Sequence, residues 1–63
     1  MYFLSKYEDL KEQGIDSASI CEAALNDGLG RLRVITVLRS LFDYSLEEAN
    51  DMFDRIESRQ YTN

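Results

Sequence analysis

Apolar residues recur along most of the chain at the three- and four-residue spacing of amphipathic helices, and few windows alternate with the two-residue period of a strand. The chain contains no proline, and its three glycines lie between the periodic segments. This pattern predicts an all-α fold. We expect a compact bundle of four short helices, at about residues 2–13, 17–26, 31–42 and 46–58.

Residues near the expected helix ends are typical caps. Gly14 and Gly28 lack the side chain that penalises a positive φ, so each suits the left-handed position that follows a helix. Asp16 or Ser17 can accept a hydrogen bond from a free backbone N–H at the start of the second helix. Because Ser19 has a glutamate three residues later, a later start of this helix is also open.

The third segment allows two interpretations. Val34, Ile35 and Val37 are β-branched, which is typical of a buried strand. The length of the segment and the charges of Arg33 and Arg39 within it favour a helix with a wide apolar face. We therefore expect a central helix that contacts its neighbours on more than one side.

The third and fourth segments form a predicted helical hairpin. Asp43 and Tyr44 make a tight turn, and Ser45 with Glu48 has the spacing of a capping box at the start of the fourth helix. Apolar stripes continue on both sides of the turn. They contain Leu32, Ile35, Leu38 and Phe42 before the turn, and Leu46, Ala49, Phe53 and Ile56 after it. The predicted core of the domain contains Leu10, Ile20, Ile35, Leu38, Phe42, Leu46, Phe53 and Ile56.

The length of 63 residues predicts a single domain, residues 1–63, with a small core and marginal stability. Cys21 is the only cysteine and histidine is absent, so an internal disulfide and a zinc site of thiolates and imidazoles are both excluded. We expect no metal and no cofactor. No segment approaches the roughly 20 apolar residues of a membrane-spanning helix, and a free cysteine fits a cytoplasmic protein.

The composition also disfavours catalysis. Histidine, the commonest general base, is missing. Cys21 could act as a nucleophile only with a lowered pKa and a nearby base. A buried structural thiol is the favoured interpretation of this residue, and we expect that the protein is not an enzyme.

The net charge of −5 bears on the class of partner. Binding to nucleic acid requires a basic surface, and the second helix of the hairpin is rich in acidic residues that phosphates would repel. A nucleic-acid-binding helix-turn-helix is therefore disfavoured. A basic protein partner is compatible with the charge, although solubility alone also accounts for it.

Residues 31–54 resemble the helical hairpin in the C-terminal domain of the bacterial ribosomal stalk protein, and small bacterial proteins that carry this hairpin alone. The matching positions are a basic residue, a Val-Ile pair, Leu-Arg and, after the turn, Leu-x-Glu-Ala. In this chain they are Arg31, Val34, Ile35, Leu38, Arg39, Leu46, Glu48 and Ala49. The resemblance covers 24 of 63 residues without a gap. It implies a bacterial protein whose exposed hairpin face contacts another protein.

The chain also departs from that family. The stalk domain packs its hairpin on a three-stranded sheet, for which this chain shows no strands. Arg31 and Arg39 match basic residues of the family's factor-binding surface, but Thr36 and Asn50 stand where the family carries lysines. Binding of translation factors is therefore not expected.

These observations predict a non-enzymatic protein that acts by protein–protein interaction, as an adaptor, a regulatory module or a homodimer. As an alternative, the acidic fourth helix would cover the basic site of a toxin or nuclease, as in an inhibitor or immunity protein. Across both hypotheses, the candidate contact residues are Arg31, Arg39, Asp43, Tyr44, Glu47, Asp51 and Asp54.

Overall fold

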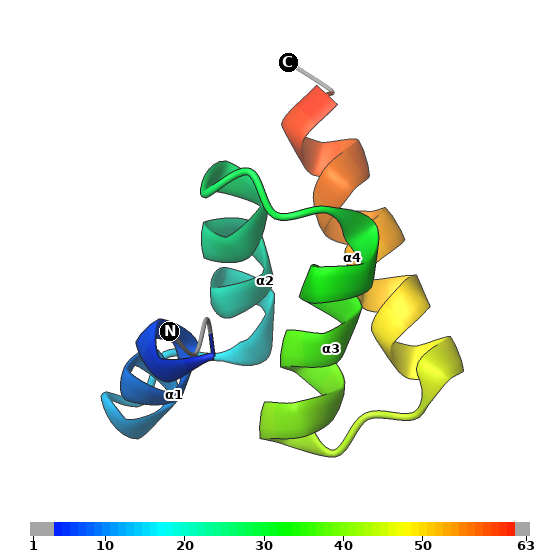
Figure 1. The fold of residues 1–63 in the computed structure, drawn as a ribbon. Coiled ribbons are helices and arrows are strands. Elements are labelled where there is room, and N and C mark those ends of the chain that lie inside the picture. Colours follow the sequence, from blue (N-terminus) through cyan, green and yellow to red (C-terminus); the bar gives the residue numbers. More distant parts are fainter. Residues whose placement is uncertain (1–3, 62–63) are drawn as a thin grey trace.

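The computed structural model describes residues 4–61, with side chains up to Arg59. It contains four helices, α1 (Ser5–Glu12), α2 (Ser17–Asn26), α3 (Arg31–Phe42) and α4 (Leu46–Tyr61) (Figure 1). No strand occurs between residues 4 and 61. The predicted all-α bundle of four short helices is therefore confirmed.

Two of the four helices differ from their predicted bounds. Leu4 precedes α1 as its cap, and the helix ends at Glu12, one residue before the predicted end; the predicted start at residue 2 lies outside the described residues. α4 continues to Tyr61, beyond the predicted end at residue 58. Neither glycine nor proline occurs in this part of the chain, so nothing local stops α4 earlier.

α3 and α4 run antiparallel as a hairpin, and α2 lies against both (Figure 1). α1 packs on α2 and α3 and makes no contact with α4 within the described part of the chain. The wide apolar face of α3 follows from this position, because α3 contacts each of the other three helices.

The first two connections turn at glycines. Gly14 has φ 90° and Gly28 has φ 85°, a conformation that side chains disfavour. After each glycine the next N–H bonds back across the helix end: Ile15 donates to the carbonyl of Leu10 at 3.1 Å, and Leu29 donates to the carbonyl of Ala24 at 3.2 Å. Both ends are Schellman caps, as the glycine positions predicted.

Side-chain caps begin two of the helices. Asp16 caps α2, since its Oδ1 accepts a hydrogen bond from the N–H of Ser19 at 3.0 Å. At α4 the predicted capping box is complete: the N–H of Glu48 donates to Ser45 Oγ at 3.2 Å, and the N–H of Ser45 donates to Glu48 Oε1 at 2.8 Å. These bonds satisfy backbone donors that a helix start leaves free.

The core gathers side chains from all four helices and from Leu4. Five of the eight predicted core residues are buried: Ile20, Ile35, Leu38, Phe53 and Ile56. Leu10 and Phe42 are half-buried and pack against this core. The core also contains Leu4, Tyr7, Cys21, Ala24, Val34, Val37 and Ala49.

The prediction that Leu46 belongs to the core is wrong, because 54% of this residue is exposed. Leu46 is the first residue of α4 and precedes the part of the helix that faces α2 and α3. Leu32 also matched the apolar stripe of α3 but is 82% exposed. It lies roughly 200° around the helix from buried Val34, at about 100° per residue, and therefore points away from the core.

Candidate protein-interaction groove

An open groove of about 610 Å³ follows the outer side of α3 and the turn into α4. We call it the α3 groove. Its lining comes from one face of α3, from the turn and from the first residue of α4. The lining residues are Leu32, Ile35, Thr36, Arg39, Ser40, Asp43, Tyr44 and Leu46.

Two exposed leucines lie toward opposite ends of the α3 groove. Leu32 is in the first turn of α3, and Leu46 follows the turn that ends this helix. With Ile15, they are the exposed large hydrophobic residues of the described chain, and Leu32 is the most exposed of the three. An exposed leucine alone is common, but two on one groove form an apolar surface of the kind found at interfaces.

The groove also carries one charge of each sign. Arg39 is in the last turn of α3, Asp43 follows four residues later as the cap of that helix, and both are exposed. Neither side chain forms an ion pair or a hydrogen bond with another residue of the described chain. Both charges therefore remain available to a bound molecule.

Tyr44 links the turn between α3 and α4 to two other residues, Ser17 and Phe42. Its hydroxyl lies 2.8 Å from Ser17 Oγ, which joins the turn to the start of α2. Its ring lies 5.8 Å from that of Phe42, centroid to centroid. Asp43, between the two aromatic residues, has φ 57° and ends α3 in a left-handed conformation. The turn is thus joined to α2 through Tyr44, and both Asp43 and Leu46 line the α3 groove.

Arg31 and Asp54, two other predicted contact residues, bind each other. Arg31 Nη2 lies 2.7 Å from Asp54 Oδ1, and Nη1 donates to Asn50 Oδ1 at 2.8 Å. The guanidinium also stacks over Phe53, 4.5 Å from the ring centroid. These contacts join the start of α3 to α4, so Arg31 has a structural role within the hairpin.

Two acidic side chains of α4 already make contacts within the chain. Asp51 forms an exposed ion pair with Arg55 at 2.8 Å, and Glu48 is held by the capping box. Glu47 is exposed and lies outside the α3 groove. A partner that covers α4 would therefore compete with existing intramolecular contacts at Asp51 and Asp54.

No protein-family model matches this chain, and no curated protein or solved structure is significantly similar to it. The resemblance to the stalk-protein hairpin therefore stays a prediction. The geometry shows only that the two matching arginines differ in role: Arg39 lies in the α3 groove, whereas Arg31 is bound to Asp54.

Cys21, the only thiol, lies in the core with no exposed surface. Burial, with a smaller contribution from the charge of Glu22, raises the pKa of the thiol to about 11. The thiolate that nucleophilic chemistry requires is therefore scarce near neutral pH. Within residues 4–59, side chains that could bind a metal do not gather in groups of three or more.

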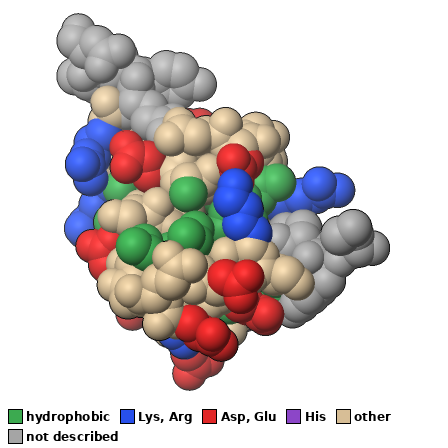
Figure 2. Space-filling model, turned by 90° about the vertical axis from the view of Figure 1, so that its left-hand side faces the viewer, with side chains coloured by type: hydrophobic (Ala, Val, Ile, Leu, Met, Phe, Trp, Pro, Cys, Tyr) green, Lys and Arg blue, Asp and Glu red, His purple; other side chains and the backbone are tan. Residues whose placement is uncertain are grey.

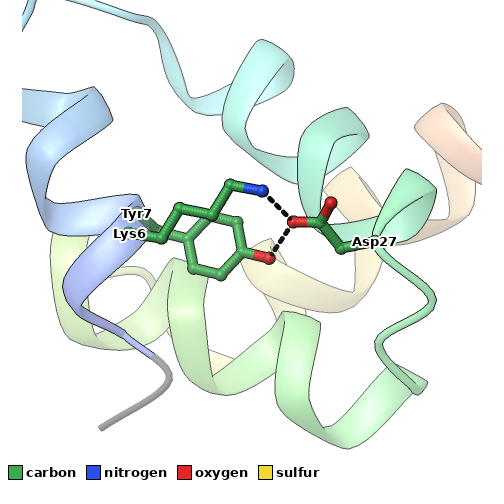
Figure 3. Close-up of polar contacts among 3 residues, drawn as sticks. All are labelled: Lys6, Tyr7 and Asp27. Carbon is green, nitrogen blue, oxygen red and sulfur yellow. Dashed lines mark hydrogen bonds and ion pairs between the residues drawn. The ribbon is translucent and has the colours of Figure 1, made fainter.

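A polar cluster outside the α3 groove joins α1 to the end of α2 (Figure 3). Asp27 Oδ2 accepts hydrogen bonds from Lys6 Nζ at 2.6 Å and from the hydroxyl of Tyr7 at 2.5 Å. On the side of α1 and α2, small groups of hydrophobic side chains lie among side chains of both charges (Figure 2). Across residues 4–61, no helix is long and apolar enough to cross a membrane.

Sequence reasoning placed Arg39, Asp43 and Tyr44 at a contact surface, and these three line the α3 groove. It missed the exposed leucines, because it assigned Leu32 to the apolar stripe of α3 and Leu46 to the core. The signal that could have identified Leu32 is its angular distance from Val34 and Leu38 on a helical wheel.

Proposed function

We propose that this chain is a non-enzymatic protein-interaction module that binds its partner through the α3 groove. The exposure of Leu32 and Leu46 on one groove carries this proposal. Most other large aliphatic side chains are buried in the core or packed against it. A domain of this size has few apolar side chains beyond those that its core requires. Two leucines left exposed beside unpaired charges fit an interface better than they fit a structural role.

The turn supports the same assignment. Interfaces bind more tightly when their contact groups are already in place before association. The Tyr44 hydroxyl lies 2.8 Å from Ser17 Oγ, and the backbone of Asp43 ends α3 at φ 57°. Tyr44 and the backbone of the turn are therefore already in place without a partner.

In the alternative function, an inhibitor or immunity-type role, α4 would be the contact surface. Asp51 and Asp54 would then exchange their ion pairs with Arg55 and Arg31 for contacts with a basic partner. Photo-cross-linking distinguishes the α3 groove from α4, because it shows which position of the chain contacts the partner.

A photo-reactive phenylalanine analogue is placed, one position at a time, at Leu32 in the groove, Glu47 on α4 and Glu22 on α2. All three residues are exposed, so the fold should tolerate each substitution. After irradiation in the source cells, we expect a cross-linked protein from the Leu32 position and none from Glu22. The additional substitution Leu46→Ser should remove the cross-link at Leu32.

A cross-link from Glu47 alone would overturn the groove proposal and favour the acidic α4 alternative. Equal cross-linking from all three positions, or none from any, would also overturn it. Helicity measured by circular dichroism confirms that each variant is folded before the comparison is made.

A further inference from the structure

The four helices do not pack equally tightly into the bundle. α2, α3 and α4 each contact the other two, so they form a closed set of packed helices. Within residues 4–61, α1 contacts α2 and α3 but not α4, and these two helices lie between it and α4 (Figure 1). α1 is also the first helix of the chain, so it can leave the others without a change in their connections.

The polar contacts that hold α1 in place include two on one carboxylate. Lys6 Nζ and the Tyr7 hydroxyl both donate to Asp27 Oδ2, on the cap of α2. Lys11 Nζ donates to the carbonyl of Leu41, in the last turn of α3, at 2.6 Å. Each lysine thus places a cation at the negative end of a helix dipole. Because both lysines are exposed, water competes for these contacts and keeps each of them weak.

The apolar contribution of α1 to the core is small. Tyr7 is the one residue of this helix that is buried, and Leu10 is half-buried. α1 has eight residues, and a helix this short does not persist in water without packing. When α1 leaves its place, its backbone hydrogen bonds should therefore open together.

We propose that α1 is a strap that opens as one unit while α2, α3 and α4 stay folded, and that Asp27 is its latch. The open chain exposes the ends of α2 and α3 that α1 covers, including Phe42, over whose ring Lys11 lies. No residue of α1 lines the α3 groove, so opening leaves that surface intact. The strap therefore does not depend on the proposed function.

Native-state hydrogen exchange of the full chain, followed by NMR at a series of low urea concentrations, tests the strap. The backbone amides of residues 8–13 should share one free energy of opening and one urea dependence. After correction for intrinsic rates, they should exchange at least roughly tenfold faster than the amides of Leu38 and Phe53, which are buried in α3 and α4. Their urea dependence should be smaller, because opening of α1 exposes less surface than global unfolding does.

Ser45→Ala separates opening of α1 from unfolding of the whole chain. It removes a cap of α4, which the closed and open forms share, and so destabilises both equally relative to the unfolded chain. Exchange at Leu38 and Phe53 should therefore become roughly fivefold faster, whereas exchange in α1 should not change.

Asp27→Ala tests the latch, because it removes contacts that only the closed form makes. Exchange in α1 should become roughly tenfold faster. Exchange at Leu38 rises with it, since the closed form is the reference state for both openings. Asp51→Ala breaks the exposed ion pair with Arg55 on α4 and is the matched control, which should change exchange in α1 by less than about twofold.

Exchange in α1 that responds to Ser45→Ala as strongly as exchange at Leu38 does would show that α1 opens only with the whole chain, and would overturn the strap. So would free energies that are graded along α1 and independent of urea, since these indicate fraying of single residues. Unchanged exchange of α1 in Asp27→Ala would overturn the assignment of Asp27 as the latch.

Discussion

The hydroxyl of Tyr7 donates a 2.5 Å hydrogen bond to Asp27, twenty residues along the chain, and so fastens α1 to the cap of α2 (Figure 3). Tyr7 is only 3% exposed. Burial, then the hydrogen bond and the charge of Asp27, raise the pKa of Tyr7 from 10.0 to about 12. Asp27 responds in the opposite direction: hydrogen bonds from Lys6 and then Tyr7 lower its pKa.

This contact predicts a loss of stability at alkaline pH. Between the unfolded-state pKa of 10.0 and the folded-state value of about 12, the folded chain binds the Tyr7 proton more strongly than the unfolded chain does. The free energy of unfolding must therefore fall as the pH rises through this interval. Urea unfolding at a series of pH values should show this fall in the wild type and a shallower one in Tyr7→Phe.

A second variant checks the cause. Asp27→Asn keeps an acceptor for the Tyr7 hydroxyl but removes the negative charge, so it should lower the pKa of Tyr7 toward 10.0. Spectroscopic titration of tyrosinate, compared with Tyr7→Phe to assign the signal, measures this pKa. If Tyr7 titrates at the same pH in Asp27→Asn and the wild type, Asp27 does not contribute to the shift.

The thiol of Cys21 should not react with added reagents while the protein is folded. It has no exposed surface, and burial raises its pKa to about 11. A thiol reagent at neutral pH should therefore label the native chain only through transient opening, and should label it rapidly in guanidinium chloride. Mass spectrometry of the labelled chain measures both rates. Equal rates in the two conditions would show an accessible thiol and return Cys21 to consideration as a nucleophile.

The helices themselves were predictable because their signals are local. A glycine such as Gly14 ends a helix through bonds to residues a few positions away, and the two residues of the capping box, Ser45 and Glu48, are three positions apart. Each such signal specifies a helix end without knowledge of the rest of the fold. The bounds of α2 and α3 accordingly match the prediction.

The candidate site was harder, because it depends on how helices face each other. Apolar spacing assigned Leu32 to the apolar stripe of α3, but only the packing of α2 and α4 on α3 shows which side of this wide stripe is covered. Charge pairing is similarly non-local. Arg31 donates a hydrogen bond to Asp54, which is 23 positions away in the sequence, and no short motif predicts this pair. The sequence alone therefore does not show which charged side chains are paired within the chain and which are free for a partner.

Truncation of leucines on the two sides of α3 should have very different effects. Leu38 is fully buried, so Leu38→Ala should destabilise the fold by about 3 kcal/mol through lost burial and a residual cavity. Leu32→Ala should change the free energy of unfolding by less than about 0.5 kcal/mol. Urea unfolding at low protein concentration, where association does not contribute, measures both.

A domain of this size has roughly 3–9 kcal/mol of stability, so Leu38→Ala could unfold much of the population. Ile56→Val is a milder test of the same core and should cost about 1 kcal/mol. If Leu32→Ala is as destabilising as Ile56→Val, then Leu32 is packed in the monomer and the α3 groove loses its apolar end.

The capping box supplies the last prediction. Ser45 Oγ accepts from the N–H of Glu48, and the Glu48 carboxylate accepts from the N–H of Ser45, so each side chain satisfies a backbone donor at the start of α4. Ser45→Ala should cost about 1 kcal/mol, and Ser45→Gly only a few tenths, because glycine leaves the backbone open to water. Glu48→Gln, which keeps an acceptor oxygen, should cost less than Glu48→Ala.

A double-mutant cycle of Ser45→Ala and Glu48→Ala measures the coupling, which must be favourable if the two bonds support each other. Strict additivity would show that the two bonds stabilise the start of α4 independently of each other.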